Sequence, residues 1–368
     1  MQKGFKKIIK HFVPAWFAVT MGTGITGINI YSLPYQFKGA RTIGHIFLFF
    51  NISLFIILLF CLTLKFILYP GSFHKSLSHS AQCMFFGTIP AGLATILNSL
   101  VMMFPHRAGF HFAAMVLWWI DVFLMLLCVF VVVTYMSVIH KYNFENVLAT
   151  WLLPIIPAVV AAGSGAVVAG SQTGLTAKII IIISYMIWGI GIPLSFCILA
   201  IYFSRIVLYG LPKPDIIIST MLPLGPMGQG CFGIVSLGSA SYQLTSSSST
   251  QSLRLFGETA YGGGIVVGLI LWGFGFFWLV MSIISMVYTF IVTKQTRFNL
   301  GWWGLIFPLG VFISGTESLA HALDSNFFRI VGTALTLVLF VLWVMNSLLT
   351  VINSVNLSLF FDPSVNDA

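Results

Sequence analysis

Long runs of apolar residues alternate along the chain with short polar segments. A helix that crosses a bilayer needs about 20 apolar residues, and many runs reach that length. With the ends of the runs placed at charged residues and at Pro and Gly clusters, the pattern predicts about ten membrane-spanning helices. They are Phe12–Leu33, Ile43–Tyr69, Ala81–Phe104, Phe110–Ile139, Val147–Gly170, Ile179–Leu208, Ile216–Leu237, Tyr261–Val292, Trp302–Leu319 and Phe327–Leu349.

The composition agrees with a bilayer environment. Of the 368 residues 58% are hydrophobic and 7% are charged, and the mean hydropathy is +1.02. These values are typical of integral membrane proteins. We expect a short N-terminal segment at 1–11, a transmembrane domain at 12–349 and a short C-terminal tail at 350–368. The five cysteines lie in apolar stretches without the spacing of a metal or redox pair, so the sequence predicts no metal and no cofactor.

The positive charges predict the orientation. If the N-terminus is cytoplasmic, most of the 17 Lys and Arg residues fall on the inner face, which favours both termini in the cytoplasm. The charges are scattered over loops and form no basic face, so no nucleic-acid binding is expected. The inner-face residues would be Lys3, Lys6, Lys7, Lys10, Lys65, Lys75, Lys141, Arg205, Lys213, Lys294 and Arg297.

Proline recurs in the odd-numbered spans, each time followed closely by Gly or Ala. The interval of about 70 residues predicts a helical hairpin that is repeated five times. A proline-broken helix is tolerated in a membrane only where protein or a water-filled cavity satisfies its backbone. We therefore expect an all-α fold with five hairpins in a quasi-fivefold ring, the broken helices lining a central pore. The alternative is that these residues only permit tight helix packing. The prolines are Pro14, Pro90, Pro157, Pro226 and Pro308.

Several stretches carry a family resemblance that extends from Phe12 to about Leu349. They resemble the tellurite-resistance/dicarboxylate transporter family, and most closely its fungal sulfite efflux pumps. The more specific stretches are Gly-Pro-Met-Gly-Gln-Gly at 225–230 and Trp-Trp-Ile-Asp at 118–121, which the yeast malate transporters of the family match less well. The other stretches are TMGTGITGINIYSLPY at 20–35, FFGTIPAGLATILN at 85–98 and WWGLIFPLG at 302–310.

The resemblance implies a function as well as a fold. It implies export of sulfite or bisulfite across the plasma membrane, with the lipid bilayer and a small anion as partners and often with a homotrimeric assembly. A dicarboxylate (malate) transporter or a small-anion channel of the same family is the alternative. In relatives a phenylalanine just before the ninth-span proline plugs the pore, and here that residue is Phe307. A bulky apolar ring excludes water and ions from a narrow pore; otherwise Phe307 only packs.

Helical periodicity extends the predicted pore face. Stepping from Phe307 places Trp303, Val311 and Ser314 of its own helix on that face, and aligning the repeats on their prolines adds residues from other spans. Polar members could donate hydrogen bonds to an oxyanion, although helix–helix bonding is the alternative. The pore-lining and substrate candidates are Phe17, Thr20, Thr23, Gly24, Phe86, Asn98, Gln229, Phe232, Trp303 and Ser314.

Two acidic residues lie within predicted spans. A carboxylate inside a membrane is costly and often functional, so Asp121 either forms a structural hydrogen bond or carries protons. Glu317 either shapes the outer mouth of the pore or pairs with Arg329 or Lys178. No pair of facing aspartates, zinc-binding helix or Ser–His arrangement occurs at a usable spacing, so the sequence predicts a transporter and not an enzyme.

Overall fold

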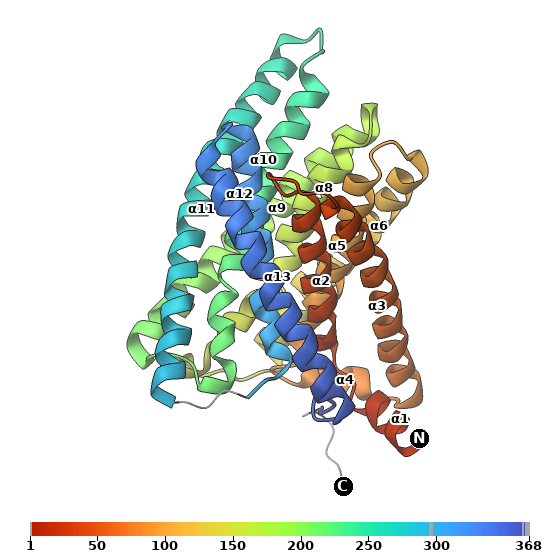
Figure 1. The fold of residues 1–368 in the computed structure, drawn as a ribbon, viewed down its shortest axis with the longest axis vertical. Helices are drawn as coiled ribbons and strands as arrows, with labels where there is room; N and C mark the ends of the chain where they lie inside the picture. Colours follow the sequence, from red (N-terminus) through yellow and green to blue (C-terminus); the bar gives the residue numbers. More distant parts are fainter. Residues whose placement is uncertain (1, 294–296, 363, 365–368) are drawn as a thin grey trace.

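The computed structural model describes residues 2–293, 297–362 and 364, so Lys294 and part of the predicted tail lie outside it. Within these ranges all regular secondary structure is helical. Helix α1 (Gln2–Lys10) and the C-terminal end of α13 (Asn326–Val355) lie at the same end of the molecule (Figure 1). We call this the termini end and the opposite one the far end.

Five successive units share one plan, in which a 3₁₀ segment leads into a short α-helix that is followed by a long one. Apart from α1 and the short segments α4 (Ser72–Ser78) and η4 (Phe144–Asn146), these units contain all the described helices. The units are η1 (Pro14–Trp16), α2 (Phe17–Tyr31) and α3 (Ala40–Leu68); η2 (Cys83–Gly87), α5 (Thr88–Met103) and α6 (Ala108–Leu126), which continues through the π-helical η3 (Leu127–Val132) into α7 (Val133–Val138); η5 (Ala149–Leu152), α8 (Ile156–Gly170) and α9 (Gly174–Tyr209); η6 (Pro214–Met221), α10 (Leu224–Thr245) and α11 (Gln251–Thr293); and η7 (Leu300–Leu305), α12 (Ile306–Ala322) and α13.

The repeated plan gives the prolines a different role from the expected one. The sequence predicts that each proline bends a continuous helix, whereas in the structure the prolines lie near helix starts. Pro157 lies at the start of α8, and Pro90 and Pro308 lie in the first turns of α5 and α12. The first-turn N–H groups of an α-helix have no partner within it, so a proline there costs no helical hydrogen bond. These three prolines therefore mark junctions between 3₁₀ and α geometry, whereas Pro14 begins the 3₁₀ segment η1 that precedes α2.

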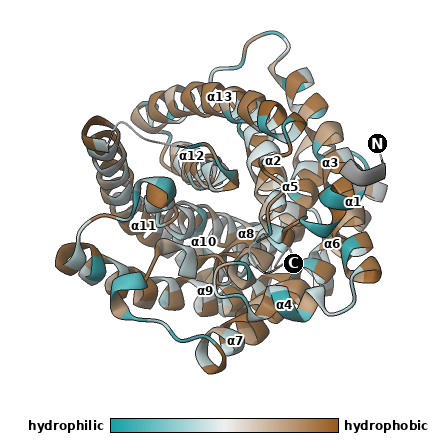
Figure 2. Ribbon diagram, turned by 90° about the horizontal axis from the view of Figure 1, so that it is seen from below, coloured by the Kyte–Doolittle hydropathy of each residue, from teal (hydrophilic) through white to brown (hydrophobic). Residues whose placement is uncertain are grey.

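Burial alternates between the short and long helices. Seven helices of the described part of the chain are long and apolar enough to cross a membrane. The most apolar 18-residue stretches of α3 and α13 are only 33% and 22% buried. The corresponding apolar stretches of η2–α5 and η7–α12 are 78% and 89% buried. The short helices α2 and α8 have only 15 residues each. Figure 2 shows the long helices at the periphery, where many of their residues have the colour of hydrophobic residues. This pattern identifies an integral membrane protein.

The short helices contact one another in a closed sequence. Helix α2 contacts α5, α5 contacts α8, α8 contacts α10, α10 contacts α12, and α12 contacts α2. The last contact is sealed by Asn29 of α2, whose Nδ2 donates to the Gly310 carbonyl at 2.8 Å and whose Oδ1 accepts from the Ser314 hydroxyl at 2.9 Å. The first and fifth units are thereby joined.

Each long helix also donates a side-chain hydrogen bond to the short helix of the next unit, and α13 of the fifth unit donates to α2 of the first. Four of the five donors are tryptophan Nε1 groups and the fifth is an asparagine amide. These side chains hold the peripheral long helices against the inner short helices. The bonds are Asn51 to Thr95 Oγ1 (3.1 Å), Trp118 to the Ala161 carbonyl (2.8 Å), Trp188 to the Gly230 carbonyl (3.2 Å), Trp272 to Thr316 Oγ1 (2.9 Å) and Trp343 to Thr23 Oγ1 (3.1 Å).

Candidate functional site

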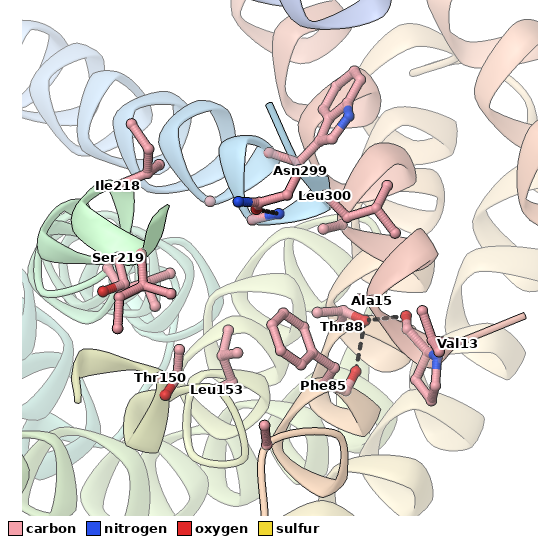
Figure 3. A pocket seen from close by; sticks show the side chains of 18 of the residues that line it. Val13, Ala15, Phe85, Thr88, Thr150, Leu153, Ile218, Ser219, Asn299 and Leu300 are labelled. Atoms are coloured by element: carbon pink, nitrogen blue, oxygen red, sulfur yellow. Dashed lines mark hydrogen bonds between the residues drawn. The ribbon is translucent and has the colours of Figure 1, made fainter. Parts of the chain in front are cut away.

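A cavity of about 450 Å³ opens between the 3₁₀ segments at the termini end. All five units line it, and Figure 3 shows side chains such as Thr88, Thr150 and Asn299 arranged around it. The Thr88 hydroxyl lies 3.0 Å from the Pro14 carbonyl and 2.7 Å from the Phe85 carbonyl, which ties the first two units together at this rim. We call this the termini-side cavity.

A second cavity, of about 150 Å³, lies among the C-terminal halves of α2, α5 and α12 and the N-terminal half of α10. Its lining is more polar and includes Asn98, Gln229, Ser314 and Glu317. An adjoining cavity of about 340 Å³ extends along α8 and α10. The two share Met102, Phe232, Ser318 and His321. We call the smaller one the far-side cavity and the larger one the adjoining cavity.

Phe307 lies at the boundary between these spaces. It is 3% exposed, lines the termini-side cavity and belongs to a buried apolar cluster with Met21 and Val311. On α2 the lining changes from the termini-side to the far-side cavity between Met21 and Ile25, one helical turn apart. On α12 it changes between Pro308 and Ser314, six residues apart. An apolar layer next to Phe307 therefore separates the two cavities.

Six of the predicted site residues reach a cavity. Trp303 and Phe307 line the termini-side cavity, and the Trp303 Nε1 also donates to Thr350 of α13 at 2.9 Å. The structure brings the other four together around the far-side cavity, from α5, α10 and α12. These four are Asn98, Gln229, Phe232 and Ser314.

The other five predicted lining residues lie at helix–helix contacts and are not among the residues that line the three described cavities. Phe17 packs edge-on against Phe55 of α3, and Phe86 does so against Phe73. Thr20 donates to the Phe17 carbonyl at 2.8 Å, Thr23 accepts from Trp343, and Gly24 leaves room for Thr95 and Asn51. Their environment is that of packing and hydrogen-bonding residues.

Asp121 is buried in α6, among the long helices. Neither of its carboxylate oxygens has a hydrogen-bond partner among the described residues, and it does not line the three cavities. Trp118, one turn earlier, donates to the Ala161 carbonyl of α8. Asp121 therefore faces protein in the peripheral layer, away from the space between the short helices.

The buried basic residues are engaged at the termini end. Lys65 Nζ lies 2.7 Å from the Phe12 carbonyl and 2.5 Å from Asp362 Oδ2. Burial raises the pKa of Asp362, but the hydrogen bonds from Lys65, Ser364 and Gln82 outweigh it and hold the pKa below its usual range. Within the described part of the chain, no Lys or Arg lines any of the three cavities.

Sequence reasoning missed the contribution of the C-terminal tail. After α13 the chain returns beneath the short helices, where Ser358, Leu359 and Phe361 line the termini-side cavity. Phe360 stacks on Trp16 with ring centroids 5.1 Å apart. The apolar residues at 359–361, next to an acidic residue, were the available signal, but Trp16, the stacking partner of Phe360, lies more than 300 residues away in the sequence.

These features agree with the comparison with known families. Residues 11–351 match the family described as Voltage-dependent anion channel (SLAC1), and the chain belongs to this family, which includes the tellurite-resistance/dicarboxylate transporters predicted from the sequence. Its members are transporters and anion channels.

Individual relatives refine the comparison. The chain is 38% identical to the sulfite efflux pump of Arthroderma benhamiae over 356 residues, which cover 96% of this chain and 93% of that protein. The sulfite efflux pump of Trichophyton rubrum has the same identity and coverage. The malic acid transport protein of Schizosaccharomyces pombe is 24% identical over 352 residues, which cover 92% of this chain and 77% of that protein.

Proposed function

We propose that this protein exports sulfite or bisulfite across the plasma membrane through a pore between α2, α5, α8, α10 and α12. The observation that carries the proposal is the pair of cavities that approach each other from opposite ends of these helices and are separated at Phe307. In this account ten helices cross the membrane as five hairpins in a quasi-fivefold ring. The closed sequence of helix contacts and the repeated hydrogen bonds between the units support that arrangement.

Phe307 closes the pore in this account. Its ring is apolar, and a narrow apolar constriction excludes water and ions until the ring moves. Once past it, the anion meets the amide groups of Asn98 and Gln229, which can donate hydrogen bonds to its oxygens, beside the Ser314 hydroxyl that donates to Asn29. The termini-side cavity holds the anion before it reaches the constriction.

The lining of the cavities supports a small monoanion over a dicarboxylate. A dianion needs strong charge compensation, whereas the described lining contains no Lys or Arg. The 38% identity to sulfite efflux pumps, compared with 24% to a malic acid transport protein, points the same way. Dicarboxylate transport is the alternative function.

The orientation and assembly complete the proposal. The termini end faces the cytoplasm, because most Lys and Arg residues of the loops belong to that side under the positive-inside rule. The termini-side cavity then receives cytoplasmic sulfite. The peripheral helices contact lipid, and the protein assembles as a homotrimer, as its resemblance to the family implies.

Flux measurements with the purified protein in liposomes test the substrate. We expect sulfite efflux to exceed malate efflux, with nitrate and chloride as small-anion controls, each measured with and without a pH gradient. Liposomes without protein give the background. Faster flux of malate than of sulfite would contradict the proposed substrate.

A further inference from the structure

Glu317 is a buried acidic residue in the far-side cavity. Its side chain is 6% exposed, and its Oε1 has no hydrogen-bond partner among the described residues. Helix α12 presents Ser314, Glu317, Ser318 and His321 to this cavity at steps of three and four residues, which is one helical face. The carboxyl group therefore borders the space that the proposed anion path crosses.

No basic residue of the described structure compensates this carboxyl group. Arg329, the basic residue on the adjacent part of α13, pairs instead with Asp324. In the far-side cavity only Glu317 and His321 are titratable. The titratable or charged groups on the other helices packed against α12 are Tyr31 on α2; Cys231, which donates to the Gly315 carbonyl, and Tyr242 on α10; and Arg254, Glu258, Tyr261 and Tyr288 on α11. Arg254 is exposed and lines none of the three cavities.

A second unpaired acceptor lines the same cavity. Asn98 is 8% exposed, and its Oδ1 is buried without a hydrogen-bond partner in the described structure. An unpaired buried acceptor is costly, because it has lost water and gained no donor. Two such acceptors around one small cavity favour a species that brings a proton, either a protonated carboxyl group or a protonated oxyanion.

The two charge states of Glu317 act on an anion in opposite ways. An ionised carboxylate repels an anion that enters the cavity, and the repulsion is strong where water is scarce. A protonated carboxyl group carries no charge and has an O–H that can donate to an anion oxygen. Protonation therefore changes this residue from a barrier into a hydrogen-bond donor.

We infer that Glu317 is a proton-binding site in the anion path, which opposes small oxyanions when it is ionised and admits them when it is protonated. The inference rests on the proposed function and adds a form of regulation to it. Export then becomes faster as the far side becomes more acidic. His321 borders the same cavity, and a variant of it separates its effect from that of Glu317.

Sulfite efflux from liposomes tests this inference when the pH is the same on both faces and is varied from about 5 to about 8. The measured quantity is the efflux of Glu317→Gln divided by that of the parent protein, after subtraction of protein-free liposomes. This ratio cancels the titration of sulfite itself. We expect the ratio to be near one at the acidic end and to rise by about tenfold toward the alkaline end, where the parent carboxyl group is ionised.

Two control variants locate the effect. Glu258→Gln removes an exposed carboxylate on α11 outside the cavities, and its ratio should not change with pH. His321→Gln should retain the pH dependence of the parent. Glu317→Ser also removes the carboxyl group and is expected to reproduce the rising ratio, so it replaces Glu317→Gln if that variant does not fold.

The possible failures can be told apart. A ratio that stays constant with pH, in a parent that exports sulfite, would overturn the inference and leave the proposed function intact. An efflux ratio that rises with pH for His321→Gln and stays constant for Glu317→Gln would also overturn the inference. A parent without sulfite efflux above the protein-free background at every pH would overturn the proposed function.

Discussion

Phe307→Ala is expected to raise sulfite flux by several-fold while the protein remains folded. In a packed core a Phe→Ala change typically costs about 3–5 kcal/mol of folding free energy. Phe307, however, borders a cavity of about 450 Å³, so part of the space around its ring is already unfilled. Removing the ring would join the two cavities into a continuous path for water and anions. The measurement is sulfite efflux from liposomes at matched amounts of protein.

Phe312→Ala is the matched control on the same helix. Phe312 is fully buried, stacks on Trp272 with ring centroids 5.5 Å apart, and does not line the described cavities. Its replacement should reduce the amount of folded protein without increasing the flux per folded molecule. Phe307→Leu should give an intermediate flux, because a smaller apolar side chain still excludes water. Flux at or below the parent level in folded Phe307→Ala would remove Phe307 as the closure.

Gly228→Ala is expected to cause a large loss of folded protein. A Cβ at this position would lie 2.4 Å from the Phe312 Cα and 2.5 Å from the Phe312 backbone nitrogen. Backbone atoms cannot rotate away as a flexible side chain can, so α10 and α12 would have to separate. That separation would disturb the contact that positions Gln229 and Phe307. We expect a strongly reduced yield of monodisperse protein and a lower unfolding temperature in detergent.

The control for this change is Gly262→Ala on α11. The structure places no other atom within 4 Å of a Cβ at Gly262, and alanine favours helix over glycine by about 0.8–1.0 kcal/mol. The yield and unfolding temperature of Gly262→Ala should therefore equal or exceed those of the parent. Equal stability of Gly228→Ala and the parent would contradict the close approach of α10 and α12.

The course of the chain could be predicted well from the sequence. Apolar run length located the helices, because a bilayer fixes the length that an apolar helix must have. The proline period located the five short helices, because each proline lies in the first turn of one of them or in the 3₁₀ segment just before it. The Gly-Pro-Met-Gly-Gln-Gly stretch at 225–230 was singled out from its resemblance alone, and the structure supplies a physical reason in the packing of Gly228.

The faces of the helices could be predicted only in part. Proline alignment placed Phe17 by analogy with α12, but Pro14 lies in the 3₁₀ segment before α2 whereas Pro308 lies inside α12. The same offset from proline therefore leads to different rotations, and Phe17 points to α3. On α12 itself ordinary periodicity from Phe307 reached Ser314, which lines the far-side cavity.

Contacts between distant parts of the chain could not be predicted from one sequence. Lys65 and Asp362 are 297 residues apart, and Asn29 and Gly310 are 281 apart. Nothing in local propensity or periodicity pairs such residues. These contacts nevertheless hold the tail beneath the termini-side cavity and join the first unit to the fifth.

The central claim is that anions pass between the short helices. Its most direct test measures sulfite efflux by Ser318→Cys after treatment with a membrane-impermeant, negatively charged thiol reagent. Ser318 lines both the far-side and the adjoining cavity. The parent and Ser252→Cys, an exposed position at the start of α11, control for the native cysteines and for labelling outside the cavities. We predict that modification abolishes efflux by Ser318→Cys and spares both controls. Complete modification of Ser318→Cys, verified by mass spectrometry, with unchanged efflux would contradict the claim.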